Sequence, residues 1–112
     1  MGTVTRLSKN TEAVKIAFQR SEMSSILDVY GRLVMAGEAR DYAIGMYRDQ
    51  AVFAIFKHHA ERPTWRVVKT PGLAQAQGAF AVHGSQDQVL KRGRDLGQVL
   101  KVFAARRFSV VG

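Results

Sequence analysis

The longest unbroken apolar segment of the chain is Ala51–Phe56, which has polar residues on both sides. A short run rich in β-branched and aromatic residues is typical of a strand buried on both faces. A helix that crosses a bilayer needs about 20 apolar residues, so this segment is far too short to do so. We therefore expect the chain to fold around a sheet in which Ala51–Phe56 is the central strand.

Period-two alternation of apolar residues predicts the other strands. A short strand is expected over 13–18, where Val14, Ile16 and Phe18 share one side. Residues 41–47 alternate in the same way and precede a polar turn, which favours antiparallel pairing with Ala51–Phe56. Three more strands are expected after it, at 65–70, 78–83 and 88–92.

Two segments have the 3–4 residue spacing of amphipathic helices. The first begins near Ser21, a suitable N-cap, and ends before Gly37, a suitable left-handed terminator. Gly31 lies inside this helix, where we expect it to mark a close approach to another backbone. The second helix is expected to be capped by Asp95 and to bury one stripe of apolar residues: Leu96, Val99, Leu100 and Phe103.

A chain of 112 residues has the length of one domain with one core. Runs of antiparallel strands flanked by helices indicate an α+β fold. We predict an antiparallel sheet of about five strands, with one helix before the main meander and one C-terminal helix. The domain is expected to cover 13–107, with a flexible tail at 1–12 and a second tail at 108–112.

The residue types required for catalysis or metal binding are not clustered in the sequence. The chain has no cysteine, which excludes disulfides and thiolate metal sites. His58 and His59 are adjacent, so in a strand they point to opposite faces, and His83 has no acidic neighbour closer than Asp87. No nucleophile elbow or phosphate-binding loop is present. We therefore expect a non-enzymatic protein without metal or cofactor.

Positive charge is concentrated in the second half of the chain. Residues 1–56 carry 7 basic and 6 acidic side chains, whereas residues 57–112 carry 10 basic and 3 acidic ones. Such an asymmetry points to an anionic partner such as nucleic acid. The side chains expected to contact phosphates are Arg66, Lys69, Lys91, Arg92, Arg94, Lys101, Arg106 and Arg107.

Base stacking requires exposed aromatic rings beside these cations. Trp65 precedes Arg66 directly, so the two side chains project to opposite faces of their strand. If Arg66 points away from the core, Trp65 cannot supply a stacking surface next to it. The basic residues thus predict phosphate contacts without predicting a partner ring.

Five segments together resemble one protein family. They are ILDVYGR at 26–32, GEARDYAI at 37–44, DQAVF at 49–53, QGA at 77–79 and LKRGRDL at 90–96. The chain resembles a family of small alphaproteobacterial proteins known as domain of unknown function 2794, over about residues 18–104. Because that family has no assigned activity, the resemblance implies a bacterial cytoplasmic protein and transfers no functional residues.

Two functions are compatible with these features. The first is a small basic protein that binds nucleic acid, or a nucleoprotein assembly, through phosphate contacts of its second half. The alternative is a protein–protein interaction module or a homodimer, because two helices do not obviously cover both faces of the sheet around Ala51–Phe56. Residues 1–10 lack an apolar core of signal-peptide length, so a cytoplasmic location without membrane contact is expected.

Overall fold

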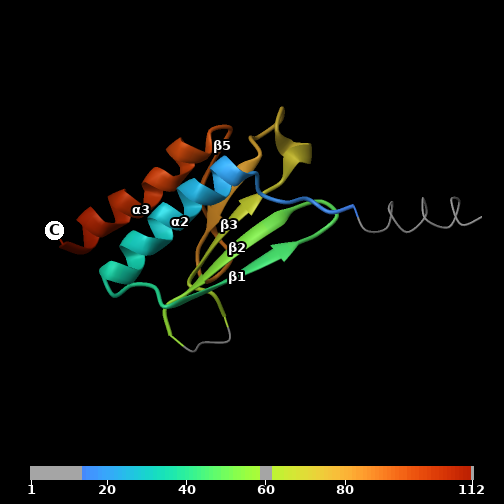
Figure 1. Cartoon of the computed structure of the whole chain (residues 1–112). Coiled ribbons are helices and arrows are strands. Elements are labelled where there is room, and N and C mark those ends of the chain that lie inside the picture. The colour runs from blue at the N-terminus through green and yellow to red at the C-terminus, as the bar shows by residue number, and fades with distance from the viewer. Residues whose placement is uncertain (1–13, 59–61, 112) are drawn as a thin grey trace, which may run out of the picture.

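The structure, a computed structural model, describes residues 14–58 and 62–111, and of residues 105–111 it describes the backbone alone. It contains a five-stranded antiparallel sheet and two long helices, so the predicted α+β fold is confirmed (Figure 1). The elements in order are α2 (Arg20–Met35), β1 (Asp41–Met46), β2 (Ala51–Phe56), β3 (Trp65–Lys69), the short 3₁₀ helix η1 (Pro71–Leu73), β4 (Phe80–His83), β5 (Val89–Gly93) and α3 (Leu96–Val111).

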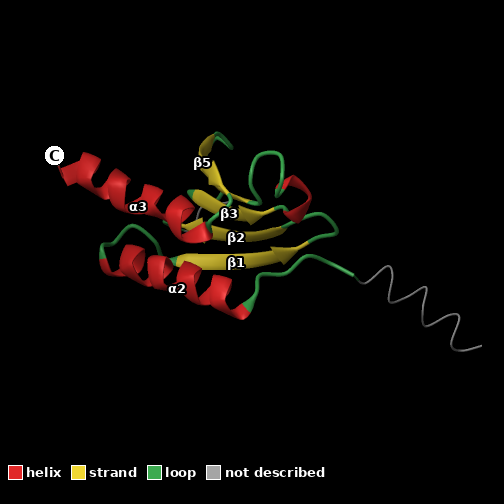
Figure 2. Cartoon of the chain, turned by 90° about the horizontal axis from the view of Figure 1, so that it is seen from above, coloured by secondary structure: helices red, strands yellow, loops and turns green. Residues whose placement is uncertain are grey.

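The sheet is a simple meander in which each strand pairs antiparallel with the next, in the order β1-β2-β3-β4-β5. The apolar run is β2, and the predicted pairing of residues 41–47 with it is confirmed by the register Ile44 to Phe53. β2 is an interior strand, as predicted, although the middle position belongs to β3. The two edges are β1 and β5, which Figure 2 shows at opposite sides of the sheet.

Both helices pack on the same face of the sheet, which we call the helix face (Figure 1). The alternation of each strand puts Phe53 and Ile55 of β2, Val67 of β3 and Val82 of β4 on this face, where all four are fully buried. Trp65 lies there too, with its ring edge-on to that of Phe103 of α3 at a centroid distance of 5.5 Å. The opposite face, which neither helix covers, is called the open face below.

Helix α2 begins earlier than predicted. Its N-cap is Gln19, not Ser21. The Glu22 carboxylate accepts a hydrogen bond from the Gln19 backbone N–H at 2.8 Å, so this donor has a partner at the start of the helix. Gly37 ends the helix with φ +75°, as predicted. The expectation for Gly31 is wrong, since no atom lies within 4 Å of where its Cβ would stand.

The chain ends differ from the sequence-based expectation. Residues 14–18 do not form the predicted strand. They cross the end of the sheet, where the Ile16 N–H donates to the Tyr47 carbonyl oxygen at 2.7 Å. Asp95 caps α3 as predicted, by accepting a hydrogen bond from the Gly97 N–H at 3.1 Å. Helix α3 continues to Val111, so the backbone of residues 108–111 is helical. The proposed tail at 1–12 lies outside the described residues.

Candidate functional site

The predicted phosphate-binding residues do not form one surface, because neighbouring positions of a strand project to opposite faces. Arg66 is paired with His83, and Arg92 with Ala81, and these positions belong to the open face. Lys69 and Lys91 are paired with Phe80 and Val82 respectively, so both belong to the helix face.

Two of the remaining basic residues are held by the fold itself. Lys69 donates hydrogen bonds to Glu22 Oε1 at 2.8 Å and to the Ala17 carbonyl oxygen at 3.1 Å. Arg94 donates to the Gln75 carbonyl oxygen at 2.8 Å. Their charges therefore tie β3 to α2, and the start of α3 to the segment after η1. The side chains of Arg106 and Arg107 lie outside the described residues.

Four charged or titratable side chains gather on the open face: Arg66, His83, Asp87 and Arg92. We call them the open-face cluster. Asp87, in the turn between β4 and β5, forms an ion pair with Arg66, and its carboxylate lies 3.3 Å from Nδ1 of His83. Nη1 of Arg92 is buried and has no hydrogen-bond partner in the part of the chain that the structure describes. An unpaired guanidinium donor makes Arg92 the candidate anion-binding group of this cluster.

The surroundings of His83 disfavour its protonated form. Burial of the imidazole lowers the pKa of His83, and the positive charges of Arg66 and Arg92 lower the pKa further. The carboxylate of Asp87 does not outweigh these effects. Two nearby cations thus oppose the protonation of His83, whereas a bound anion would favour it.

The floor beside the cluster consists of small and branched apolar side chains. Gly45, Val52, Val68 and Ala81 follow one another across the first four strands of the open face, and the last three are buried. Arg92 follows Ala81 and ends this row at the β5 edge. A row of small and branched apolar side chains thus leads from the β1 edge to the guanidinium group of Arg92.

Two aromatic rings border this floor. The Tyr47 ring covers Gly45, whose added Cβ would stand 2.6 Å from the Tyr47 hydroxyl oxygen, and Tyr47 is half exposed. Phe56 is paired with Asp41 at the other end of β2 and projects to the open face by alternation from the buried Phe53. The inference that Trp65 and Arg66 diverge is confirmed, since Trp65 is in the core. Tyr47 and Phe56 provide the rings that Trp65 does not.

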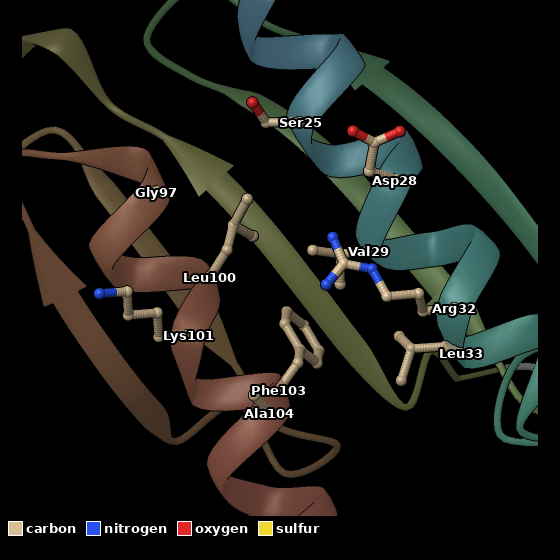
Figure 3. Close-up of a pocket in the computed structure, with 10 residues that line it drawn as sticks. All are labelled: Ser25, Asp28, Val29, Arg32, Leu33, Gly97, Leu100, Lys101, Phe103 and Ala104. Carbon is tan, nitrogen blue, oxygen red and sulfur yellow. The ribbon is translucent and has the colours of Figure 1, made fainter.

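A pocket separate from the open-face cluster lies between α2 and α3. It has a volume of about 270 Å³. Leu100 and Phe103 form part of its lining, and Figure 3 shows Arg32 reaching from α2 into the space between the helices. Asp28 and the predicted phosphate ligand Lys101 also line it, so its charges are mixed. This hollow is a seam between two packed helices rather than a basic surface.

Other kinds of site find no support in the described ranges. Within residues 14–58 and 62–111, no group of three or more His, Asp or Glu side chains is placed to hold a metal ion. β2 ends at Phe56, so His58 follows the strand and does not belong to it, and His59 lies outside the described residues. No helix in the described ranges is both long and apolar enough to cross a membrane.

Sequence reasoning missed four residues of this surface. The predicted strand 78–83 ends at His83, and the sequence separation of His83 and Asp87 does not reveal that a hairpin brings Asp87 back beside both His83 and Arg66. Tyr47 and Phe56 could have been found from alternation alone, since Phe56 lies an odd number of positions from the core residue Phe53.

Comparison with known proteins identifies the family without assigning an activity. No curated protein and no solved structure matches the chain. The model of one family, described as "Protein of unknown function (DUF2794)", matches residues 16–100. This match covers all five strands, α2 and the start of α3. The chain therefore belongs to the DUF2794 family of proteins of unknown function.

Proposed function

We propose that this protein is a non-enzymatic, cytoplasmic nucleic-acid-binding protein that holds a single strand on the open face of its sheet. The observation that carries the proposal is the buried Nη1 of Arg92, which has no acceptor among the described residues. A phosphate oxygen of the strand would supply this acceptor, and Arg66 and His83 stand beside it to contact the same backbone.

Arginine suits this role because its planar guanidinium has five N–H donors and always carries a charge. Leaving one of these donors buried and unpaired costs about 1–3 kcal/mol, which binding of an anion recovers. Arg66 is already paired, but its partner Asp87 is mostly exposed, so a phosphate can compete with that carboxylate. The two arginines thus provide two phosphate contacts on one face.

The aromatic rings favour a single strand over a duplex. Tyr47 and Phe56 stand at opposite ends of the β1–β2 hairpin on this face, where unpaired bases can stack on them. Stacking on aromatic side chains contributes about 1–3 kcal/mol per base and tolerates any sequence. A duplex hides these base faces and would meet only the cations. The surface therefore fits a strand that lays its bases on the sheet and its phosphates toward Arg66 and Arg92.

The proposal is tested by fluorescence anisotropy with labelled oligo(dT) and oligo(U) at low and moderate salt. The double variant R66Q/R92Q removes two cations of the open face. It is expected to weaken binding at least tenfold and to reduce the slope of log K against log salt by about 1.4. The matched control K91Q/K101Q removes the same charge from β5 on the helix face and from α3. It is expected to bind almost as well as the natural protein.

Two results would contradict the proposal. One is the absence of binding by the natural protein at low salt. The other is equal weakening in both double variants, which would show that net charge alone attracts the oligonucleotide. Circular dichroism and urea unfolding of each variant establish that differences in binding do not arise from unfolding.

A further inference from the structure

The pocket between α2 and α3 has an apolar floor. Leu33 of α2 and both Leu100 and Phe103 of α3 line it, and these side chains are only 2%, 6% and 5% exposed. Val29 of α2, which packs against the same core, is partly buried beside them. Gly97, near the start of α3, contributes no side chain to fill the space. A group that enters between the helices therefore meets apolar side chains.

Arg32 brings a positive charge to this floor. Figure 3 shows its guanidinium group reaching between the two helices, whereas the carboxylate of Asp28 points away from it. The amino group of Lys101, the other cation of the lining, points away from α2. Among the described side chains that line the pocket, Arg32 thus supplies the one charge that faces the apolar floor.

The Arg32 side chain is unpaired in the part of the chain that the structure describes. Asp28 lies four residues before it on α2, at the spacing that favours an ion pair along a helix. The ion pairs and hydrogen bonds of the described residues nevertheless include no contact of the Arg32 guanidinium group. A planar guanidinium binds a carboxylate through two parallel hydrogen bonds. The donors of Arg32 are therefore available to the carboxylate of a ligand.

The charge and the size of the pocket limit what this ligand can be. One arginine matches the single negative charge of a carboxylate better than that of a phosphate group, which carries nearly two charges at neutral pH. The volume of the pocket is about 270 Å³. A protein cavity of about 150 Å³ binds benzene, so this pocket holds a somewhat larger apolar group. We therefore propose that the pocket between α2 and α3 binds a small apolar carboxylate, with its apolar part against Leu100 and Phe103 and its carboxylate on Arg32.

The two parts of such a ligand contribute separately to binding. Sites for small molecules combine an apolar lining with a few polar groups that fix orientation. Contacts with Leu33, Leu100 and Phe103 remove the apolar part from water, and Arg32 sets the position of the charged end. An uncharged molecule of the same size keeps the first contribution and loses the second. The site should therefore discriminate between an acid and the corresponding alcohol.

Titration with sodium octanoate, followed by backbone amide shifts in NMR spectra, tests the site. The natural protein should bind octanoate with a dissociation constant of about 1 mM or below. The largest shifts should come from the segments of α2 and α3 that line the pocket. Octanol has an alkyl chain of the same length without the charge, and it should bind at least tenfold more weakly.

Two single variants separate the role of Arg32 from that of net charge. Arg32→Gln should weaken octanoate binding at least tenfold and leave octanol binding nearly unchanged. Arg32 is exposed, so this variant should fold, which circular dichroism verifies. Lys101→Gln is the matched control, because it removes one positive charge from the same lining at a group that points away from α2. It should bind octanoate as the natural protein does.

The proposal is overturned if octanoate at about 10 mM causes no saturable shifts, or if octanol binds as tightly as octanoate. Shifts confined to the open-face cluster would overturn it too, as would equal weakening in R32Q and K101Q. Unchanged octanoate binding in R32Q would overturn it by showing that Arg32 only covers the apolar side chains. This inference does not rest on nucleic-acid binding. The variant R66Q/R92Q changes the open face and should still bind octanoate, so the two proposals can fail separately.

Discussion

Lys69 of β3 donates a hydrogen bond from Nζ to Oε1 of Glu22, in the first turn of α2, at 2.8 Å. The two side chains are only 13% and 15% exposed, and the same carboxylate oxygen also accepts the N–H of the helix cap Gln19. One carboxylate thus joins the start of α2 to the sheet. This contact also removes Lys69 from the set of cations available to a nucleic acid.

Loss of this ion pair should destabilise the fold. Lys69→Met leaves the Glu22 carboxylate without its cation in a largely buried place, which should lower the free energy of unfolding by about 2 kcal/mol. In a urea double-mutant cycle, E22Q/K69M should cost less than the two single changes together. Lys91→Met is the control, since Lys91 is exposed on the same face and is expected to change stability by less than about 0.5 kcal/mol. Additive effects in the cycle would contradict a direct coupling.

Gly78→Ala should be strongly destabilising. Gly78 has φ +97°, and a Cβ there would collide with the carbonyl group of Gly93 and stand 2.8 Å from the Arg94 backbone nitrogen. Both the conformation and the lack of space oppose a side chain, so we expect a loss of about 2 kcal/mol or more in urea unfolding. An unchanged midpoint would show that the approach of the two backbones is looser than described.

Gly31→Ala should have the opposite effect. Gly31 is inside α2, and an added Cβ meets no atom within 4 Å. Alanine restricts the unfolded chain more than glycine and favours the helix, so the free energy of unfolding should rise by about 0.5–1 kcal/mol. The same urea titration measures it. A loss of stability would indicate that a partner molecule or another residue needs the space beside Gly31.

Asp87→Asn should strengthen binding of oligonucleotides by about threefold, because it frees Arg66 and removes a carboxylate that repels phosphate. Asparagine tolerates the φ of +66° at this position, so the turn should be retained. Asp28→Asn removes the same charge beside the seam between the helices and is the control for net charge. Equal gains in both variants would argue against a direct competition at Arg66.

His83 should make stability depend on pH. Its pKa in the folded protein is lowered, first by burial and then by Arg66 and Arg92, so the unfolded chain binds the proton more readily. The stabilisation is therefore complete above the ordinary pKa of about 6.5 and is lost as the pH falls below that value. His83→Gln should reduce the difference in unfolding free energy between about pH 7.5 and about pH 5.5. Saturating oligonucleotide should reduce it as well, because a nearby phosphate raises the pKa of His83.

The order and type of the main elements could be predicted because they depend on local patterns. Alternation in residues 41–47 and the run Ala51–Phe56 identified a hairpin that the structure contains, and Asp95 and Gly37 marked helix ends correctly. The predicted strand over 13–18 failed because alternation of apolar residues does not by itself supply a pairing partner. Ser21 was a plausible cap, but Gln19 forms it because the Glu22 carboxylate reaches the Gln19 N–H.

The candidate site was only partly predictable, because local patterns do not show how distant segments of the chain pack together. The sequence by itself determined that Arg66 and Trp65 diverge, and that Lys91 and Arg92 diverge, since the strand period is two. The tertiary structure alone decided that both helices cover one face, which turns Arg66 and Arg92 toward the open one and Lys69 toward Glu22. It also decided that the turn between β4 and β5 brings Asp87 to Arg66 and His83. Local periodicity sorts side chains into two faces, but only the long-range packing of helices on strands determines which face stays open.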